Sequence, residues 1–267
     1  MGMTVQFDPT TARSDLLEEL RTIVGTERVK HESVDLVRYR PGPWGYTDLD
    51  QVYGWTPFLA VCPRSAEDVA ACLAVIARAG FPIVPVTGGT GLTGGSLATS
   101  DSIVIDLGDM DEIVAIDRVS RRATVSANIR IESLQNVARA ANLLFAHDPW
   151  SAPIATVAGT ISTNSVGYLA AGYGPMGSQV LGLRVALTTG ALLTLTRQPA
   201  TTAGPDLASL FIGSEGTFGV IVEATVRLHP MPEQERLIGF GFDHFEDAFK
   251  ALDAAIEARL ALAMVDL

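Results

Sequence analysis

The chain has 267 residues, a length that fits one large domain or two modest ones and is sufficient to bury a substantial core. Apolar residues make up 48% of it and charged residues 18%, which places it among sequences that fold rather than among disordered ones. Its 30 acidic residues against 19 basic ones give a formal net charge of −11, which repels phosphate backbones and disfavours nucleic-acid binding.

The first predicted element is an N-terminal helix with apolar residues at helical spacing. Ser14 is placed to cap this helix and Gly25 to end it. An aromatic, turn-rich segment follows and leads to a domain boundary near Trp55. Residues 1–54 are therefore predicted to form an accessory segment.

Beyond this boundary, strands and helices alternate quickly, with more strands than a simple βαβ repeat would use. Ser65 opens a helix through a capping box with Asp68, and Gly80 ends it. No internal repeat of a length typical of solenoids is found. We therefore predict an α+β fold, or a mixed α/β one. The predicted strands span residues 58–62, 81–86, 102–107, 113–116, 123–127, 181–187, 192–196 and 220–228, and a further helix spans 131–141.

After two prolines the pattern restarts with a strand over residues 237–242, a helix capped by Asp243 and a strand that begins at Met264. A strand, a helix and the first residues of another strand cannot bury their own apolar faces. We therefore expect residues 55–232 to form the main domain and residues 233–267 to be the incomplete start of a further one.

The sequence favours a cytoplasmic protein without a transmembrane segment. The N-terminal residues lack a basic segment followed by an apolar run, so no secretory signal is predicted. The uncharged stretch 149–183 is broken by prolines and glycines, which makes it unsuitable as a bilayer helix. Cys62 and Cys72 stand alone, without the spacing of a disulfide framework or a zinc site.

The most informative segment is a loop of glycines and threonines from Pro85 to Ser96. It contains a GxGxxG match that begins at Gly89, but a dinucleotide-binding fold of that type requires a long helix to start inside the motif. The next strand begins at Ser102, soon after Gly94, so no such helix fits and a nicotinamide-binding fold is rejected. The backbone N–H groups of such a loop can instead form an anion-binding nest. A tight turn between two strands is the alternative, but it needs fewer glycines.

Two further segments share this small, uncharged character. Residues 147–167 are rich in hydroxyl groups and glycine and include Asn164, which suits close approach to a flat ligand, although alone they could equally be a buried loop. Residues 211–221 place three glycines around Glu215 just before a strand and could alone form only a turn. Three such loops at strand ends are what a large, flat cofactor with a pyrophosphate needs.

In this order and spacing the segments resemble the FAD-binding domain, of the p-cresol methylhydroxylase (PCMH) type, in the vanillyl-alcohol oxidase and p-cresol methylhydroxylase superfamily. The pattern P-x-x-x-G-T-G-x-x-G-G is met over 85–95, D-P-x-S over 148–151, T-x-x-G-x-x-x-x-N over 156–164 and F-x-G-S-E-G-T-x-G-V-I over 211–221. The chain is most similar to a branch with the FAD subunit of glycolate oxidase and the D-lactate and D-2-hydroxyglutarate dehydrogenases. The resemblance implies an α+β domain of two subdomains with mixed sheets and flanking helices, followed by the start of an α+β cap domain.

The resemblance also implies FAD as the cofactor. Members of the family that bind FAD covalently use a His or Cys, and none lies in residues 85–96, so noncovalent binding is expected. The chain has Val86 and Thr87 where the family often has Arg and Gly, and Ala158 where the family has a second glycine beside Gly159. The implied pyrophosphate loop is Val86, Thr87, Gly88, Gly89, Thr90 and Gly91, the implied flavin and ribityl contacts are Trp150, Ser151, Thr156, Gly159, Ser162, Thr163, Asn164 and Gly167, and Glu215 and Val220 complete the site.

The chemistry implied by the family is oxidation of a 2-hydroxy acid by hydride transfer to flavin N5, while the protein supplies positioning and electrostatics. The family's substrate residues and metal ligands lie in the cap and C-terminal region, so no metal site is expected here and the catalytic residues are unknown. Among the histidines only His147 lies near the expected flavin, where it is a candidate general base or a structural residue of its loop.

The resemblance and the composition leave two interpretations of function. In the first, the chain is the FAD-binding portion of a 2-hydroxy-acid dehydrogenase or oxidase and meets its substrate only with the cap region or a partner subunit. In the second, it is a stand-alone FAD-binding subunit for electron transfer or assembly. Both predict a hetero- or homo-oligomer, and a peripheral association with the membrane through an electron-acceptor partner is left open. The hydroxy acid and the electron acceptor are not identified by the sequence.

Overall fold

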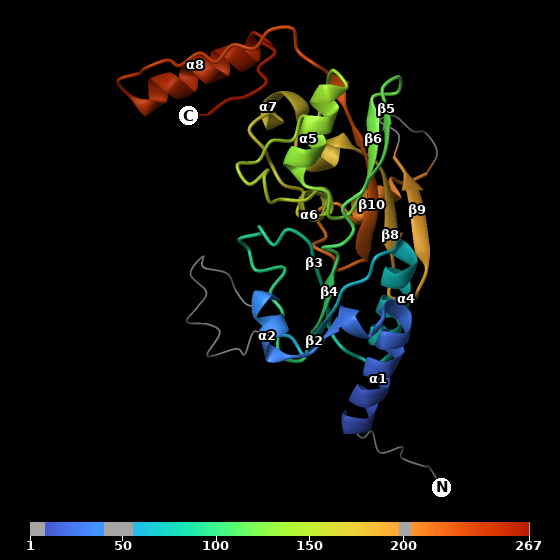
Figure 1. Cartoon of the computed structure of the whole chain (residues 1–267). Helices are drawn as coiled ribbons and strands as arrows, with labels where there is room; N and C mark the ends of the chain where they lie inside the picture. The colour runs from blue at the N-terminus through green and yellow to red at the C-terminus, as the bar shows by residue number, and fades with distance from the viewer. Residues whose placement is uncertain (1–8, 40–55, 198–203, 267) are drawn as a thin grey trace.

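The structure is a computed structural model that describes residues 9–39, 56–197 and 204–266. It places the described strands in a four-stranded sheet, a five-stranded sheet and a short two-stranded one (Figure 1). This arrangement of mixed and antiparallel sheets with flanking helices confirms the predicted α+β class. The predicted boundary at Trp55 lies outside the described residues, and the division of the chain into domains stays a prediction.

The first sheet has the strand order β1-β2-β4-β3. Strand β1 (Val29–Lys30) is antiparallel to β2 (Leu59–Val61). Strand β4 (Ile103–Asp106) lies between β2 and β3 (Ile83–Val86) and is parallel to both. Since β3 and β4 are parallel, the loop that follows β3 emerges at the same end of the sheet as the chain that follows β4.

Helices α1 (Pro9–Val24) and α4 (Ala66–Arg78) pack against each other beside this sheet. The predicted start of the first helix at Ser14 is wrong: the helix already begins at Pro9, whose fixed φ suits the first helical position. Its predicted end is confirmed, because Gly25 follows it with a φ of +94°. The capping of α4 is also confirmed, since the Ser65 hydroxyl accepts a hydrogen bond from the Asp68 N–H at 3.0 Å.

The second sheet is fully antiparallel and has the order β5-β6-β10-β8-β9. Its strands are β5 (Ile113–Asp117), β6 (Arg122–Ser126), β8 (Val180–Ala186), β9 (Leu192–Thr196) and β10 (Val220–Arg227). β10 is the last of the five in the chain but occupies the centre, between the β5-β6 and β8-β9 hairpins. One face of the sheet is apolar and buried, and the other is polar, as the alternating burial of β10 shows.

Shorter elements connect the sheets, and most of them carry too weak a periodicity to be predicted. α5 was expected and spans Ile131–Ala140, whereas α6 (Val157–Ser162) lies in a segment expected to be a loop. Residues 87–102 contain no helix, in agreement with the rejection of a nicotinamide-binding fold. The remaining elements are α2 (Ser33–Leu36), α7 (Ala170–Tyr173), β7 (Leu143–Leu144), β11 (His229–Pro230) and 3-10 turns at Thr26–Arg28, Val37–Tyr39, Met176–Gln179 and Leu207–Leu210.

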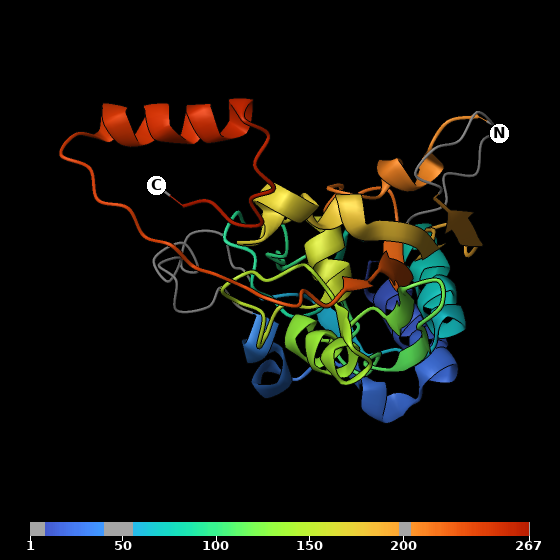
Figure 2. The ribbon, with the colours of Figure 1, turned by 90° about the horizontal axis from the view of Figure 1, so that it is seen from above.

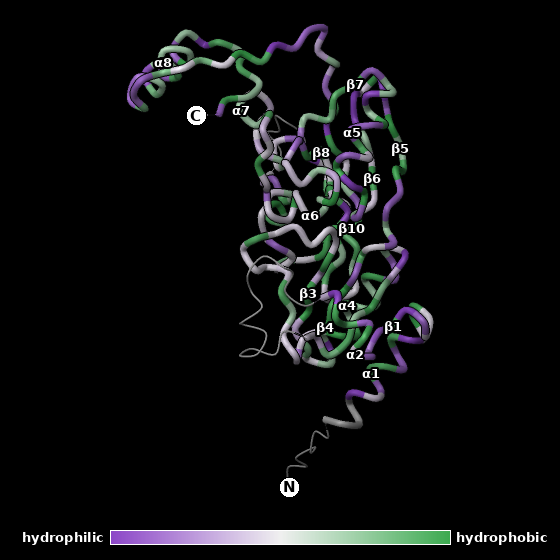
Figure 3. The backbone as a smooth tube through the Cα atoms, turned by 60° about the vertical axis from the view of Figure 1, so that its left-hand side comes forward, coloured by the Kyte–Doolittle hydropathy of each residue, from purple (hydrophilic) through white to green (hydrophobic). Residues whose placement is uncertain are grey.

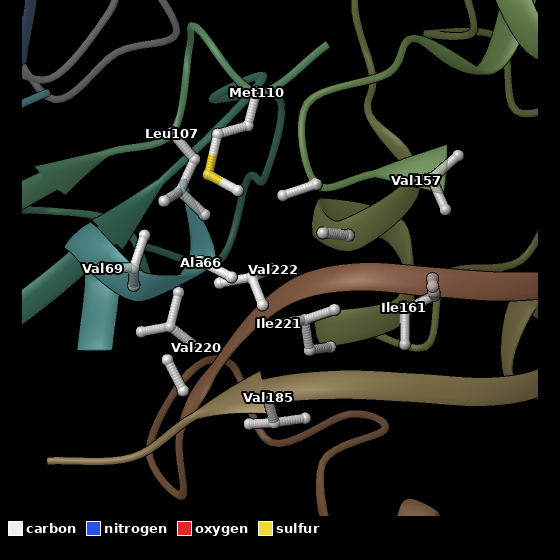
Figure 4. Close-up of a cluster of buried hydrophobic side chains, with 14 of the residues drawn as sticks. Ala66, Val69, Leu107, Met110, Val157, Ile161, Val185, Val220, Ile221 and Val222 are labelled. Atoms are coloured by element: carbon white, nitrogen blue, oxygen red, sulfur yellow. The ribbon is translucent and has the colours of Figure 1, made fainter. Parts of the chain in front are cut away.

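The larger of two clusters of buried hydrophobic residues connects the two larger sheets. Val220 and Val222 of β10 belong to the same buried cluster as Ala66 and Val69 of α4, and Leu107, which directly follows β4, joins them (Figure 4). The backbone coloured by hydropathy shows apolar stretches along the strands of both larger sheets (Figure 3). The apolar face of α1 also belongs to this cluster. The positions of the two sheets are therefore fixed by shared packing.

The C-terminal region is built differently from the prediction. Helix α8 (Phe245–Glu257) forms, but His244 rather than Asp243 precedes it, and no side chain caps it. The predicted strands over 237–242 and from Met264 are wrong, since these residues have no strand partner in the described structure and a strand without a partner lacks its hydrogen bonds. α8 projects from the body of the protein and buries none of its residues (Figure 2).

Candidate cofactor-binding site

A cavity of about 380 Å³ lies between the carboxyl end of the first sheet and the start of β10. Its walls come from the loop after β3, from residues 149–151, from α6 and from residues 215–221. All of the cofactor residues predicted from the sequence line this cavity, except Asn164 and Gly167. Segments more than a hundred positions apart in the sequence thus meet in one place. The lining also includes residues that were not predicted: Pro85, Leu92, Thr93, Gly95, Ser96, Leu107, Pro149, Ala158, Thr160, Ser165, Val166, Gly216, Gly219 and Ile221.

The glycine loop after β3 presents its backbone to the cavity. Gly89 has a φ of +62°, and a Cβ atom added to it would meet no atom within 4 Å, so the space above it is open. The N–H groups of Gly89, Thr90 and Gly91 have no hydrogen-bond acceptor among the described residues. Adjacent backbone donors in a loop that lines an open cavity fit an anionic group such as a pyrophosphate.

The α6 side of the cavity is held against the glycine loop. A Cβ atom on Gly88 would lie 2.5 Å from the Ile154 carbonyl oxygen, so only glycine permits this close approach. The Thr156 hydroxyl caps α6 by accepting a hydrogen bond from the Gly159 N–H at 3.3 Å. The same hydroxyl donates to the hydroxyl of Thr87 at 2.7 Å. The two walls of the cavity are therefore joined by a direct polar contact.

Asn164 and Gly167 do not belong to the lining of this cavity. Asn164 has a φ of +48°, and its side-chain oxygen accepts a hydrogen bond from the Gly177 N–H at 2.9 Å. A Cβ atom on Gly167 would lie 2.8 Å from the backbone nitrogen of Asp148. Both residues thus shape the turn that follows α6. The contacts to a cofactor that the resemblance implies for them stay a prediction.

Glu215 carries the one charged side chain among the described residues of the lining. Its φ is +51°, and its backbone N–H donates to the Ser162 carbonyl at 3.0 Å. A Cβ atom on Gly95 would lie only 1.9 Å from the carboxylate, so the second glycine pair of the loop makes room for this side chain. Apart from this carboxylate the described residues of the lining are uncharged, so they can hold an anion only through backbone and hydroxyl donors.

His147 is buried behind the cavity, with 1% of its surface exposed. It does not belong to the lining; its Nε2 atom lies 2.9 Å from the hydroxyl oxygen of Ser165, which does. Burial lowers the pKa of His147 from 6.5 to about 4, so the ring is neutral at pH 7. The structure therefore connects His147 to the cavity only through Ser165, and a role as general base stays a prediction.

Two further observations concern metals and membranes. Within the described residues, no three His, Cys, Asp or Glu side chains are grouped closely enough to hold a metal ion. No helix of the described chain is both long and apolar enough to cross a bilayer.

Burial raises the pKa of the Cys72 thiol to about 12, so this side chain is a core residue rather than a ligand or nucleophile.

Together these features define a class of protein. A mixed sheet and an antiparallel sheet enclose a cavity whose described lining carries a single charged side chain, Glu215. The cavity combines three backbone N–H groups that have no acceptor among the described residues with hydroxyl groups and the exposed indole of Trp150. Such a site suits a dinucleotide that has a pyrophosphate and a flat ring. Residues 57–196 match the family model described as FAD binding domain. The chain belongs to this family, the FAD-binding domains of PCMH type in the vanillyl-alcohol oxidase and p-cresol methylhydroxylase superfamily.

Comparisons with individual proteins agree with this assignment. The chain is 32% identical over 240 residues to glycolate oxidase subunit GlcD of Escherichia coli, a match that covers 90% of this chain and 47% of that protein. It is 33% identical over 196 residues to mitochondrial D-lactate dehydrogenase [cytochrome] 1 of Saccharomyces cerevisiae, over 72% of this chain and 33% of that protein. The chain thus spans half or less of the length of these relatives.

The fold is also that of a solved structure of p-cresol methylhydroxylase with substrate bound. The two superpose with a TM-score of 0.80 at 20% sequence identity, over 94% of this chain and 50% of the other. At this identity the likeness establishes the fold alone.

Proposed function

We propose that this chain is the FAD-binding portion of a flavin-dependent oxidoreductase that oxidises a 2-hydroxy acid of the glycolate, D-lactate or D-2-hydroxyglutarate type. The observation that carries the proposal is the cavity lined by free N–H groups and hydroxyls in a chain of the FAD-binding family. The names of the relatives, glycolate oxidase and D-lactate dehydrogenase, support the substrate class. Bound FAD would supply the two-electron oxidation, in which flavin N5 accepts the hydride from the substrate carbon.

The residues of this chain would bind and orient the cofactor. The N–H groups of Gly89, Thr90 and Gly91 would hold the pyrophosphate, and the hydroxyls of Ser151, Ser162 and Thr163 would meet the polar edges of the flavin and ribityl chain. No His or Cys belongs to the described lining, which supports noncovalent attachment.

Substrate binding would require residues outside this cavity. A carboxylate substrate is ordinarily held by cations, and none of the described lining residues is Lys or Arg. We expect the carboxylate clamp and the base to come from a cap region or from a partner subunit, in a hetero- or homo-oligomer. The same observation favours a second candidate function, a stand-alone FAD-binding subunit that transfers electrons or assists assembly without substrate chemistry.

The purified chain tests both candidates. Its absorbance spectrum should show a flavin that copurifies with it, and acid or heat should release this flavin intact as FAD. A colour that stays with the precipitated protein, or FMN in its place, would contradict noncovalent FAD binding.

A second measurement separates the two functions. D-lactate, glycolate or D-2-hydroxyglutarate is added without oxygen to the chain alone, and then to the chain together with a cap region or a partner subunit. Bleaching of the flavin only in the complex supports the dehydrogenase. No bleaching in either sample supports the stand-alone subunit. Bleaching in the chain alone would show a complete active site within these residues.

A further inference from the structure

Residues 33–39, which include α2, pack on the face of the first sheet that is turned away from α1 and α4 (Figure 1). Leu36 and Tyr39 are the buried residues of this segment. They belong to a second hydrophobic cluster, smaller than the one that connects the two sheets. Its other members are Ala60, Ala98 and Val104, with Val84 and Val86 packed against it. The predicted accessory segment thus packs on the strands that lead to the glycine loop.

Both ends of the glycine loop are part of this cluster. Val86 is the last residue of β3 before the loop, and Ala98 lies where the loop ends. Within residues 87–97, all of which are described, only one backbone hydrogen bond forms, from the Leu97 N–H to the Gly94 carbonyl at 3.0 Å. Glycine loses more conformational freedom than any other residue when it is ordered. A loop so rich in glycine therefore depends on its ends for its shape.

A buried carboxylate connects residues 33–39 to the first sheet. The Tyr39 hydroxyl donates to Oδ2 of Asp106 at 2.6 Å, and the Gly108 N–H donates to Oδ1 at 2.8 Å. The Nη2 atom of Arg38 lies 3.6 Å from the same Oδ2. Burial and the neighbouring carboxylate raise the pKa of Tyr39, so its hydroxyl keeps the hydrogen that it donates. Asp106 is 4% exposed, and a carboxylate buried to this extent is costly without such donors.

Asp106 lies beside the start of the glycine loop. It ends β4, and its register partner on β3 is Val86. The next residue, Leu107, donates its N–H to the Val86 carbonyl at 3.0 Å and lines the cavity. Tyr39 and Asp106 do not belong to the described lining, so they can affect a ligand only through their neighbours. Tyr39 thus joins the strand end at the start of the loop to the cluster that holds Ala98 at its end.

We propose that residues 33–39 are a brace for the glycine loop, and that Tyr39 and Asp106 are positioning residues whose hydrogen bond holds the ends of the loop for the cofactor. The proposal rests on the proposed function, since the ligand in question is FAD. By linkage, a segment that favours the ordered loop and a cofactor that binds this loop stabilise each other. The brace then belongs to the cofactor-binding unit, although none of its residues lines the described cavity.

Two substitutions test the contact. Tyr39→Phe keeps the packing of the ring and removes the donor, and FAD affinity is measured from the quenching of flavin fluorescence on addition to the apoprotein. This variant should bind FAD about 10-fold more weakly, the lower end of the range for a lost hydrogen bond to a charged group, because only the part that orders the loop reaches the cofactor. Asp106→Asn should give a similar loss, since an amide offers one oxygen to two donors. The double variant should lose no more than either single one, because both changes remove the same contact.

The matched control is Ser65→Ala, which removes the cap of α4 on the other face of the same sheet. It should destabilise the fold and leave the affinity for FAD unchanged. Urea titration of every variant without FAD shows that each one folds and by how much it is destabilised. A loss of FAD affinity in Ser65→Ala as large as that in Tyr39→Phe would be a general effect of stability and would overturn the brace.

Hydrogen exchange followed by mass spectrometry gives a readout that a purely structural contact would not change. FAD should slow the exchange of backbone amides in residues 33–39 as well as in the glycine loop, and in Tyr39→Phe only the protection of the loop should remain. Unchanged FAD affinity in Tyr39→Phe, or no effect of FAD on residues 33–39 of the wild type, would overturn the brace alone. A wild-type chain that binds no FAD would overturn the proposed function and the brace with it, which is a distinct result.

Discussion

The buried ring of His147 should make the stability of this protein depend on pH. Burial lowers its pKa from 6.5 to about 4, so between these values the unfolded chain binds a proton that the folded protein does not. The contribution of His147 to the free energy of unfolding is therefore greatest above about pH 6.5 and falls as the pH drops toward 4. Because the ring is fully buried, its contribution is not reduced by solvent screening, and the loss amounts to about 2 kcal/mol at pH 5 and about 3 kcal/mol at pH 4.

Urea unfolding followed by circular dichroism between pH 8 and pH 5 measures this loss. His147→Gln retains an amide that can reach the Ser165 hydroxyl but cannot gain a proton. The variant should be less stable than the wild type at pH 8, yet its stability should fall by about 2 kcal/mol less on going to pH 5. His244→Gln, a change at an exposed histidine, is the control and should follow the wild type.

A neighbouring carboxyl group acts in the opposite direction but cancels in the comparison. Burial raises the pKa of Asp148, so its protonation on acidification favours the folded state. It is present in all three proteins and contributes equally to each curve. Parallel curves for the wild type and His147→Gln would refute the argument that the buried ring resists protonation.

Three further outcomes are expected. FAD at 100 times its dissociation constant should stabilise the wild type by about 2.7 kcal/mol and raise its melting temperature, and Gly89→Asp should abolish this increase. The isosteric Gly89→Asn should lose less of it, because it adds no charge beside the pyrophosphate. Equal FAD responses in all three proteins would disprove the loop assignment. Ser65→Ala removes the hydroxyl that caps α4 and should lower the free energy of unfolding by about 1 kcal/mol with no change in FAD affinity, and a urea titration showing no loss would contradict the capping role. A chain that ends at Pro232 lacks α8 and its exposed aromatic residues, so it should associate less in gel filtration. It should still bind FAD and melt at the same temperature as the full chain. A large fall in its melting temperature would mean that α8 stabilises the rest of the protein.

Local signals predicted much of this fold. Strands β2 to β6 and β8 to β10 and helices α4 and α5 follow from hydrophobic period, capping and glycine positions, whereas the two-residue strand β7 was not predicted. The short helix α6 could not be predicted, because a run of small and hydroxyl residues has little helical periodicity. Its cap at Thr156 is recognised only from the hydrogen bond that the Gly159 N–H donates to the Thr156 hydroxyl. Leu237–Phe242 shows the opposite error: its apolar pattern suits a strand, but a strand forms only where a partner is available.

The candidate site could be predicted in outline but not in its inner contacts. Three glycine-rich segments and a family resemblance were enough to gather most of the cavity lining. The contact of Thr87 with Thr156 and the space that Gly95 leaves for Glu215 each join residues far apart in the sequence. Such pairs leave no periodic trace in a single sequence, since they depend on how the two sheets pack.

The central position of β10 has a consequence for how the protein is made. Ribosomes release the β5-β6 and β8-β9 hairpins first, and each of them has an open edge until residues 220–227 emerge. An open edge can pair with another chain, so this interval during synthesis is the one most exposed to aggregation. The strand also carries Val220 and Ile221 into the cavity lining, so a nascent chain acquires its cofactor pocket only when this last strand inserts. FAD that is present during translation would stabilise the sheet once β10 has inserted, and would shorten the time for which the hairpin edges are open.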